Sequence, residues 1–138
     1  MNALALGVAV VFAVLAGFHV YWLFGGKAAG SAAIPEVDGR PAFVPGAVAT
    51  LGVVLALTGC AVLTLALGGW MGLPLPERWT TGLGYAMAAA FFLRAIGEFR
   101  LVGFFKRVRG TRFARWDTWL FSPLCLALAL AVFFLARG

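Results

Sequence analysis

Charged side chains are scarce in this chain. Only 12% of its 138 residues are charged and 63% are hydrophobic, whereas a soluble domain carries about 25% charged and about 45–50% apolar residues. A soluble protein of this composition would expose large apolar patches and would aggregate. The shortage of charge therefore excludes an ordinary soluble domain and favours a protein whose solvent is lipid.

Histidine and cysteine are also rare, which limits metal and cofactor chemistry. His19 is the one histidine, so a haem held between two histidines would need a second copy of the chain. Cys60 and Cys125 lie in separate apolar segments and form no CxxC or Cys/His spacing. No Ser/His/Asp set, nucleotide-binding glycine loop or pair of metal-binding carboxylates is recognisable. We therefore expect no cofactor and no metal, and no enzyme class is indicated.

Long apolar runs are what the chain does contain. They predict membrane-spanning helices at approximately residues 4–24, 45–70, 79–103 and 117–136, each near the ~20 residues that cross hydrocarbon. The third run is the least regular, because charged residues begin before it is complete. The length fits one domain covering residues 1–138. The sequence thus predicts an all-α fold, a four-helix transmembrane bundle.

The distribution of basic residues predicts the orientation in the membrane. Lys106, Arg107, Arg109, Arg112 and Arg115 crowd one short segment between the third and fourth spans. By the positive-inside rule, loop 104–116 is then cytoplasmic, loop 25–43 is cytoplasmic as well, and both termini lie outside. The same bases would attract anionic lipid headgroups. Because topology explains these bases, the net charge of +6 does not require a nucleic-acid partner.

Several polar residues are expected at one depth near the cytoplasmic face. These candidate binding residues are His19, Trp22, Arg94, Glu98, Arg100 and Asp117. Ionisable groups inside a membrane segment are costly and are candidates for function. One interpretation is a cytoplasm-facing pocket that holds a headgroup, an anion or a proton-coupled solute.

The alternative interpretation of the same residues is structural. Arg94 and Glu98 stand one helical turn apart and are expected to pair as a buried staple, although pairing with other helices remains open because Arg before Glu is the less favourable order. Arg100 would extend to the interface. Asp117 would cap the start of the fourth span. Gly82, Ala86 and Ala90 repeat every fourth position, which predicts the packing face of the third span.

Several short motifs are distributed along the chain. They are His19-Val20-Tyr21-Trp22 followed by Gly25-Gly26, Ile34-Pro35, Gly39-x-Pro41-x-Phe43-x-Pro45-Gly46, Arg94-x-x-Gly97-x-x-Arg100, Phe104-Phe105-Lys106 with Asp117, and Ser122-Pro123-Leu124-Cys125. In these segments the chain resembles the small bacterial membrane proteins grouped as domain of unknown function 3995. The resemblance implies a four-helix protein of the bacterial cytoplasmic membrane, and it implies no activity.

Three hypotheses of function remain. The first is a non-enzymatic membrane component that binds lipid or a partner helix. The second is a small proton- or cation-coupled transporter, working as a homodimer, with Glu98 as the coupling carboxylate. The third is a membrane enzyme acting on a lipid, with Glu98, His19 and Asp117 as acid–base groups.

Overall fold

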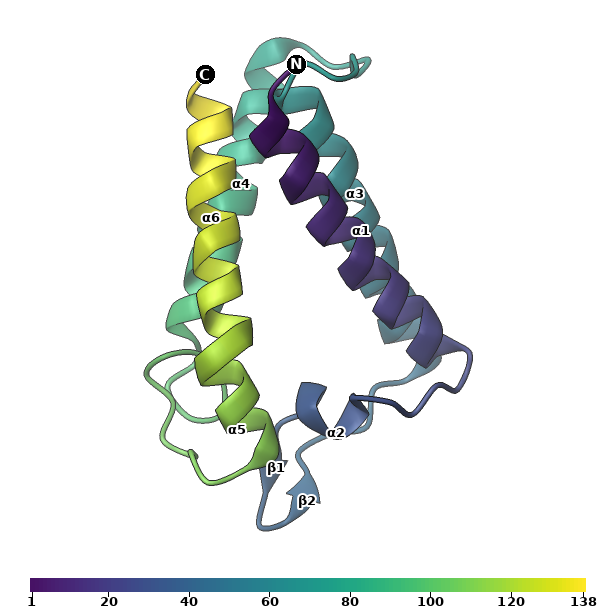
Figure 1. The fold of residues 1–138 in the computed structure, drawn as a ribbon, viewed down its shortest axis with the longest axis vertical. Helices are drawn as coiled ribbons and strands as arrows, with labels where there is room; N and C mark the ends of the chain where they lie inside the picture. The colour runs from purple at the N-terminus through teal and green to yellow at the C-terminus, as the bar shows by residue number, and fades with distance from the viewer.

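The fold consists mainly of helices that run alternately up and down. The computed structural model describes residues 1–138, and its long helices are α1 (Ala3–Leu23), α3 (Ala47–Leu67), α4 (Glu77–Ile96) and α6 (Ser122–Arg137). Both termini lie at one end of the molecule (Figure 1). The short elements lie towards the opposite end, called here the loop end; they are α2 (Gly30–Ala33), β1 (Glu36–Val37), β2 (Arg40–Pro41), α5 (Arg112–Trp116) and the π-helical turn η1 (Asp117–Phe121).

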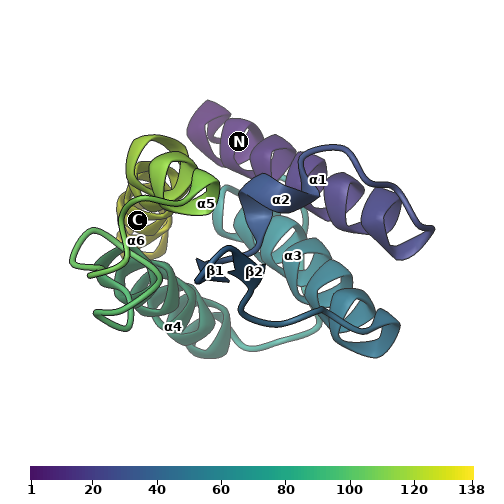
Figure 2. The same cartoon turned by 90° about the horizontal axis from the view of Figure 1, so that it is seen from below.

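The long helices form two antiparallel pairs. Helix α1 packs along α3, and α4 packs along α6. The two pairs approach each other near the termini and diverge towards the loop end (Figure 1). Seen from below, α2 and the hairpin β1–β2 lie beneath the space between the pairs (Figure 2). In this hairpin Glu36 pairs with Pro41, and Val37 with Arg40.

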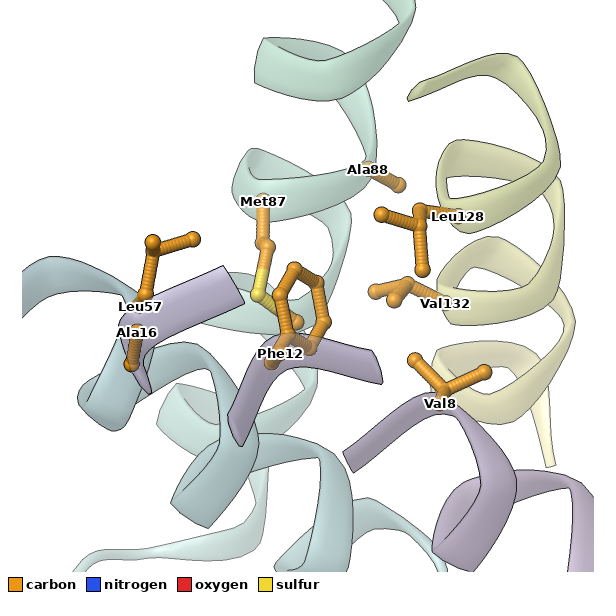
Figure 3. Close-up of a cluster of buried hydrophobic side chains, with 8 residues drawn as sticks. All are labelled: Val8, Phe12, Ala16, Leu57, Met87, Ala88, Leu128 and Val132. Carbon is orange, nitrogen blue, oxygen red and sulfur yellow. The ribbon is translucent and has the colours of Figure 1, made fainter. Parts of the chain in front are cut away.

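A hydrophobic core joins the two pairs. Its buried members are Val8, Phe12 and Ala16 of α1, Leu57 of α3, Met87 and Ala88 of α4, and Leu128 and Val132 of α6 (Figure 3). Phe12 is fully buried, and its ring centroid lies 5.3 Å from that of Phe91. Gly84 permits a close crossing, because a Cβ there would lie 2.9 Å from both Ala136 Cβ and Leu67 Cδ1. The core therefore holds the two helix pairs together. Their loop-end halves lie apart (Figure 1).

Three helical segments are long and apolar enough to cross a membrane. They are Ala3–Leu23, Ala47–Leu67 and Arg112–Arg137, and they coincide with the first, second and fourth predicted spans. The last is one 26-residue helix made of α5, η1 and α6. Pro123 follows the π-helical turn of this helix. Proline has no N–H to donate, and the altered hydrogen bonding of a π-helical turn accommodates this loss. The prediction of a mostly helical protein of membrane type is confirmed.

Helix α4 corrects the third predicted span, 79–103. The helix begins at Glu77 and ends at Ile96, and Gly97 follows it with a φ of 86°, a conformation that glycine adopts without strain. The predicted packing face of this helix is also wrong, because Gly82, Ala86 and Ala90 are exposed. The buried residues of α4 are Gly84, Met87, Ala88 and Ala95. They mark the face of α4 that packs against its neighbours, chiefly α6.

Candidate functional site

A buried carboxylate, Asp117, organises the loop end of the α4–α6 pair. Its side chain has no exposed surface. Oδ1 accepts a hydrogen bond from Arg94 Nη2 at 2.8 Å. Oδ2 accepts from the backbone N–H of Gly103 at 2.7 Å and from Lys106 Nζ at 3.1 Å. One carboxylate thus joins the end of α4, the loop 97–111 and the start of the last helix.

Lys106 is the second buried ion of this cluster. Its ammonium donates to the carbonyl oxygen of Gly103 at 2.9 Å, to Asp117 at 3.1 Å and to Thr118 Oγ1 at 2.6 Å. An ammonium has three N–H donors, so every donor of Lys106 has a partner. The side chain is fully buried, which corrects the expectation that Lys106 contributes to a lipid-binding basic loop.

Arg94 is the member of the cluster whose hydrogen bonds are incomplete. Its Nη2 reaches Asp117, but its Nη1 is buried with no hydrogen-bond partner. Two cations, Arg94 and Lys106, therefore share the single carboxylate of Asp117. Because the other two acceptors of Lys106 are neutral, the cluster as a whole carries one unbalanced positive charge, and Arg94 is the cation whose donors are not all paired.

The expected pairing of Arg94 with Glu98 is wrong. Helix α4 ends at Ile96, so the two residues do not share a helix face and Arg94 turns to Asp117. The expected N-cap role of Asp117 is wrong as well. Thr111 caps this helix, its Oγ1 accepting from the N–H of Ala114 at 3.0 Å, and Asp117 lies inside the helix, six residues after the cap.

Glu98 has a local role in the turn that follows α4. One carboxylate oxygen accepts the backbone N–H groups of Arg100 at 3.2 Å, of Leu101, and of Val102 at 3.1 Å. These bonds, that of Leu101 first, hold the pKa of Glu98 below its ordinary value. Glu98 is exposed, so it is an anionic anchor for a surface turn.

The turn brings two glycines into contact. Gly97 and Gly103 both have positive φ, 86° and 89°. A Cβ on Gly97 would overlap the carbonyl oxygen of Val102, and a Cβ on Gly103 would overlap that of Ile96. This close approach allows the N–H of Gly103 to reach Asp117. The sequence patterns did not identify this use of glycine.

A cavity of about 650 Å³ lies between the two helix pairs at the loop end. Most of its lining residues are hydrophobic; they are Leu15, His19, Trp22, Gly26, Gly30, Ala33, Ile34, Phe43, Pro45, Ala49, Thr50, Val53, Leu57, Phe91, Arg94, Phe113, Phe121, Leu124, Cys125 and Leu128. Of the six candidate residues, the structure brings His19, Trp22 and Arg94 to this cavity. Glu98, Arg100 and Asp117 are not among the lining residues.

His19 presents one ring nitrogen that has no protein partner. Its Nδ1 lies 2.7 Å from the carbonyl oxygen of Leu15; a carbonyl only accepts, so Nδ1 carries the proton and Nε2 is left free. The ring of His19 stands edge-on to Trp22, with centroids 5.0 Å apart. Trp22 in turn donates from Nε1 to the carbonyl oxygen of Ala28 at 2.9 Å. These contacts fix the side of the cavity opposite Arg94.

Segments from both halves of the chain border the cavity at the loop end. Helix α2 packs against α5, and Arg112 Nη1 donates to Ser31 Oγ at 3.0 Å. Phe43 and Ile34 from one loop and Phe113 from α5 line the same cavity. Of the residues that build this site, Lys106, Gly103, Thr50 and Phe113 were not predicted. Lys106 follows Phe104 and Phe105 but precedes Arg107, so the sequence contained no clear signal of its burial.

Comparison with known proteins gives a family and no activity. No curated protein and no solved structure matches the chain. The family described as "Protein of unknown function (DUF3995)" matches residues 12–132, a range that contains all four long helices in whole or in part, the cavity and the Arg94–Asp117–Lys106 cluster. The chain belongs to the DUF3995 family.

Proposed function

We propose that this protein is a non-enzymatic membrane component that crosses the bilayer four times and binds one amphiphilic lipid molecule between its helix pairs. Helix α4 is the fourth crossing. It has 20 residues, about the number that spans hydrocarbon, and it packs along α6. Its one charged residue beyond the first turn, Arg94, lies in its last turn.

The observation that carries this proposal is the cavity. Ligand sites are typically concave, mostly apolar and about 300–1,000 Å³, with a few polar groups that orient the ligand. The space between the helix pairs has a volume of about 650 Å³ and combines an apolar wall with Arg94, His19, Trp22 and Thr50. An amphiphile matches this combination of one long apolar surface and few polar groups.

Charge supports a cytoplasmic position for the loop end, in the membrane of a bacterial cell. Five arginines are exposed there: Arg100, Arg107, Arg109, Arg112 and Arg115. Clustered bases in a short loop favour the cytoplasmic side and anionic headgroups. The termini would then lie outside, as the sequence predicts.

The two rival functions have less support. A proton-coupling carboxylate needs a pKa near the working pH and access to the transported solute. Glu98 has a lowered pKa and lies outside the cavity. An acid–base pair of His19 and Asp117 is equally hard to support, because both oxygens of Asp117 already accept hydrogen bonds from the protein.

Native mass spectrometry of the protein released from nanodiscs tests the proposal. Wild-type protein is expected to retain one lipid-sized molecule. Val53→Trp, which fills the cavity from α3, is expected to lose it, because Val53 lines the cavity. Val48→Trp is the matched control, since Val48 on the same helix is 87% exposed and is not a lining residue. Equal retention by all three proteins would refute binding in the cavity.

A further inference from the structure

Resting on the proposed lipid binding, we infer that the ligand is a single-chain amphiphile with an anionic head, a carboxylate or a phosphate, bound by the guanidinium of Arg94. Its hydrocarbon chain lies among the apolar residues between α1, α3 and α6. The inference comes from the charge of the cluster beside the cavity, from the unpaired donors of Arg94, and from the volume of the cavity.

The charge of the cluster calls for an additional anion. Asp117 neutralises one of its two cations, and Glu98 is engaged elsewhere with backbone N–H groups. An unbalanced charge within a membrane is costly unless it finds a partner. Of the two cations, only Arg94 lines the cavity. An anion in the cavity can therefore complete the cluster through Arg94.

The donor geometry of Arg94 selects the kind of anion. A guanidinium presents its N–H groups as a planar fork that matches the two oxygens of a carboxylate or a phosphate. One edge of this fork already holds Asp117 through Nη2. Nη1 is unpartnered but buried, so the guanidinium must turn towards the cavity for Nη1 to meet an anion there. His19 lines the same cavity, but with the proton on Nδ1 its Nε2 is an acceptor, so recognition of an anionic head falls to Arg94.

The volume of the cavity fits one hydrocarbon chain. At ~30 Å³ for a group the size of a water molecule, a cavity of about 650 Å³ holds about 20 such groups. One acyl or alkyl chain with a small head has about that many heavy atoms, whereas a two-chain phospholipid has more than twice as many. Phe91, Leu124 and Leu128 are among the lining residues that would contact the chain.

Competitive binding in nanodiscs of phosphatidylcholine tests the inference. Four probes are added: a free fatty acid, a monoalkyl phosphate, the neutral alcohol of the same chain length, and the two-chain phosphatidic acid. The bound fraction of each is measured by native mass spectrometry. We expect both single-chain anions to bind roughly tenfold or more tightly than the alcohol. The tighter of the two anions identifies the source of the head, as a fatty acid or a phosphate ester.

Substitutions of Arg94 locate the head. Arg94→Gln should remove the preference for anions over the alcohol, while the alcohol still binds. Arg94→Lys should keep part of this preference for anions. Arg100→Gln is the matched control, because it removes the same charge from an exposed residue outside the cavity. If Arg94→Gln does not fold, a preference of Arg94→Lys equal to that of wild type would itself refute recognition by the guanidinium fork.

The outcomes separate this inference from the proposed function. Equal binding of alcohol and anions, with loss of both in Val53→Trp, would refute the anionic head and leave lipid binding in the cavity intact. Phosphatidic acid competing as well as the single-chain anions would refute the single chain. No binding of any probe to wild type would refute the proposed function itself.

Discussion

Arg94 Nη2 and Asp117 Oδ1 lie 2.8 Å apart and join the end of α4 to the start of the last helix. The two residues are 23 positions apart in the sequence, and their contact fixes the second helix pair beneath its hydrophobic core. Nη1 of Arg94 is buried and unpartnered, and Arg94 lines a cavity that the first helix pair completes. The proposed ligand would therefore bind the same guanidinium that joins the two helices.

The buried ion cluster is expected to depend strongly on its one carboxylate. Asp117→Asn leaves Lys106 fully buried without a counter-ion, and breaking a buried pair in this way costs ~3–5 kcal/mol. Thermal or urea unfolding in mild detergent, followed by circular dichroism, measures the loss. Asp38→Asn is the control, since Asp38 is exposed and should change stability by less than ~0.5 kcal/mol. Equal effects of the two variants would contradict the structural role of Asp117.

The turn after α4 is expected to tolerate no side chain at its two closely packed glycines. Gly97→Ala and Gly103→Ala each place a Cβ against a backbone carbonyl and require a positive φ, so both should lower the melting temperature by several degrees. Gly110→Ala in the same loop meets nothing within 4 Å and should be close to wild type. A Gly103→Ala variant of unchanged stability would rule out the described path of loop 97–111.

Glu98 is expected to stabilise the protein near neutral pH and not in acid. Its folded-state pKa is lowered, chiefly by the N–H of Leu101. The unfolded state therefore takes up the proton first as pH falls, and the stabilisation present above about pH 5 is lost as pH falls through the folded pKa. The melting temperatures of wild type and Glu98→Gln should differ at pH 7, and this difference should shrink as the pH falls below about 5. A difference in melting temperature that grows in acid would show that the folded-state pKa of Glu98 is raised.

The four-span topology predicts that the two ends of α4 lie on opposite sides of the membrane. In a chain with Cys60 and Cys125 replaced by alanine, Gly72→Cys should react with an impermeant maleimide in intact cells. Arg107→Cys should react only after the membrane is opened. Reaction of both cysteines under the same condition would mean that α4 does not cross, and reaction of Arg107→Cys alone would reverse the orientation.

The sequence allowed three of the four predicted spans to be placed because their apolar runs contain few charges. Helices Ala3–Leu23, Ala47–Leu67 and Arg112–Arg137 follow these runs closely. The end of α4 could not be placed in this way. Apolar residues continue past Gly97 with Phe99, Leu101 and Val102. The helix stops because Gly97 adopts a positive φ and Glu98 binds the following N–H groups, and hydrophobic periodicity does not reveal either contact.

Part of the site was predictable from the up-and-down order of the helices. Alternating helices bring His19, Trp22 and Arg94 to one depth, and the structure places all three around one cavity. The partner of Arg94 was not predictable from helical spacing, which favoured Glu98. Asp117 can be identified as the partner of Arg94 only when the path of the loop is known. The same loop buries Lys106 against Thr118, and its path depends on tertiary packing.

Photo-crosslinking tests the central account most directly. A fatty acid that carries a diazirine near the end of its chain is added to the protein in nanodiscs, and the modified residues are mapped by peptide mass spectrometry. The account predicts modification of cavity residues such as Leu15, Phe91 and Leu124, and its loss when excess unlabelled fatty acid is present. Modification confined to outward residues such as Val10 and Leu55, which are exposed, would contradict a ligand site between the helix pairs.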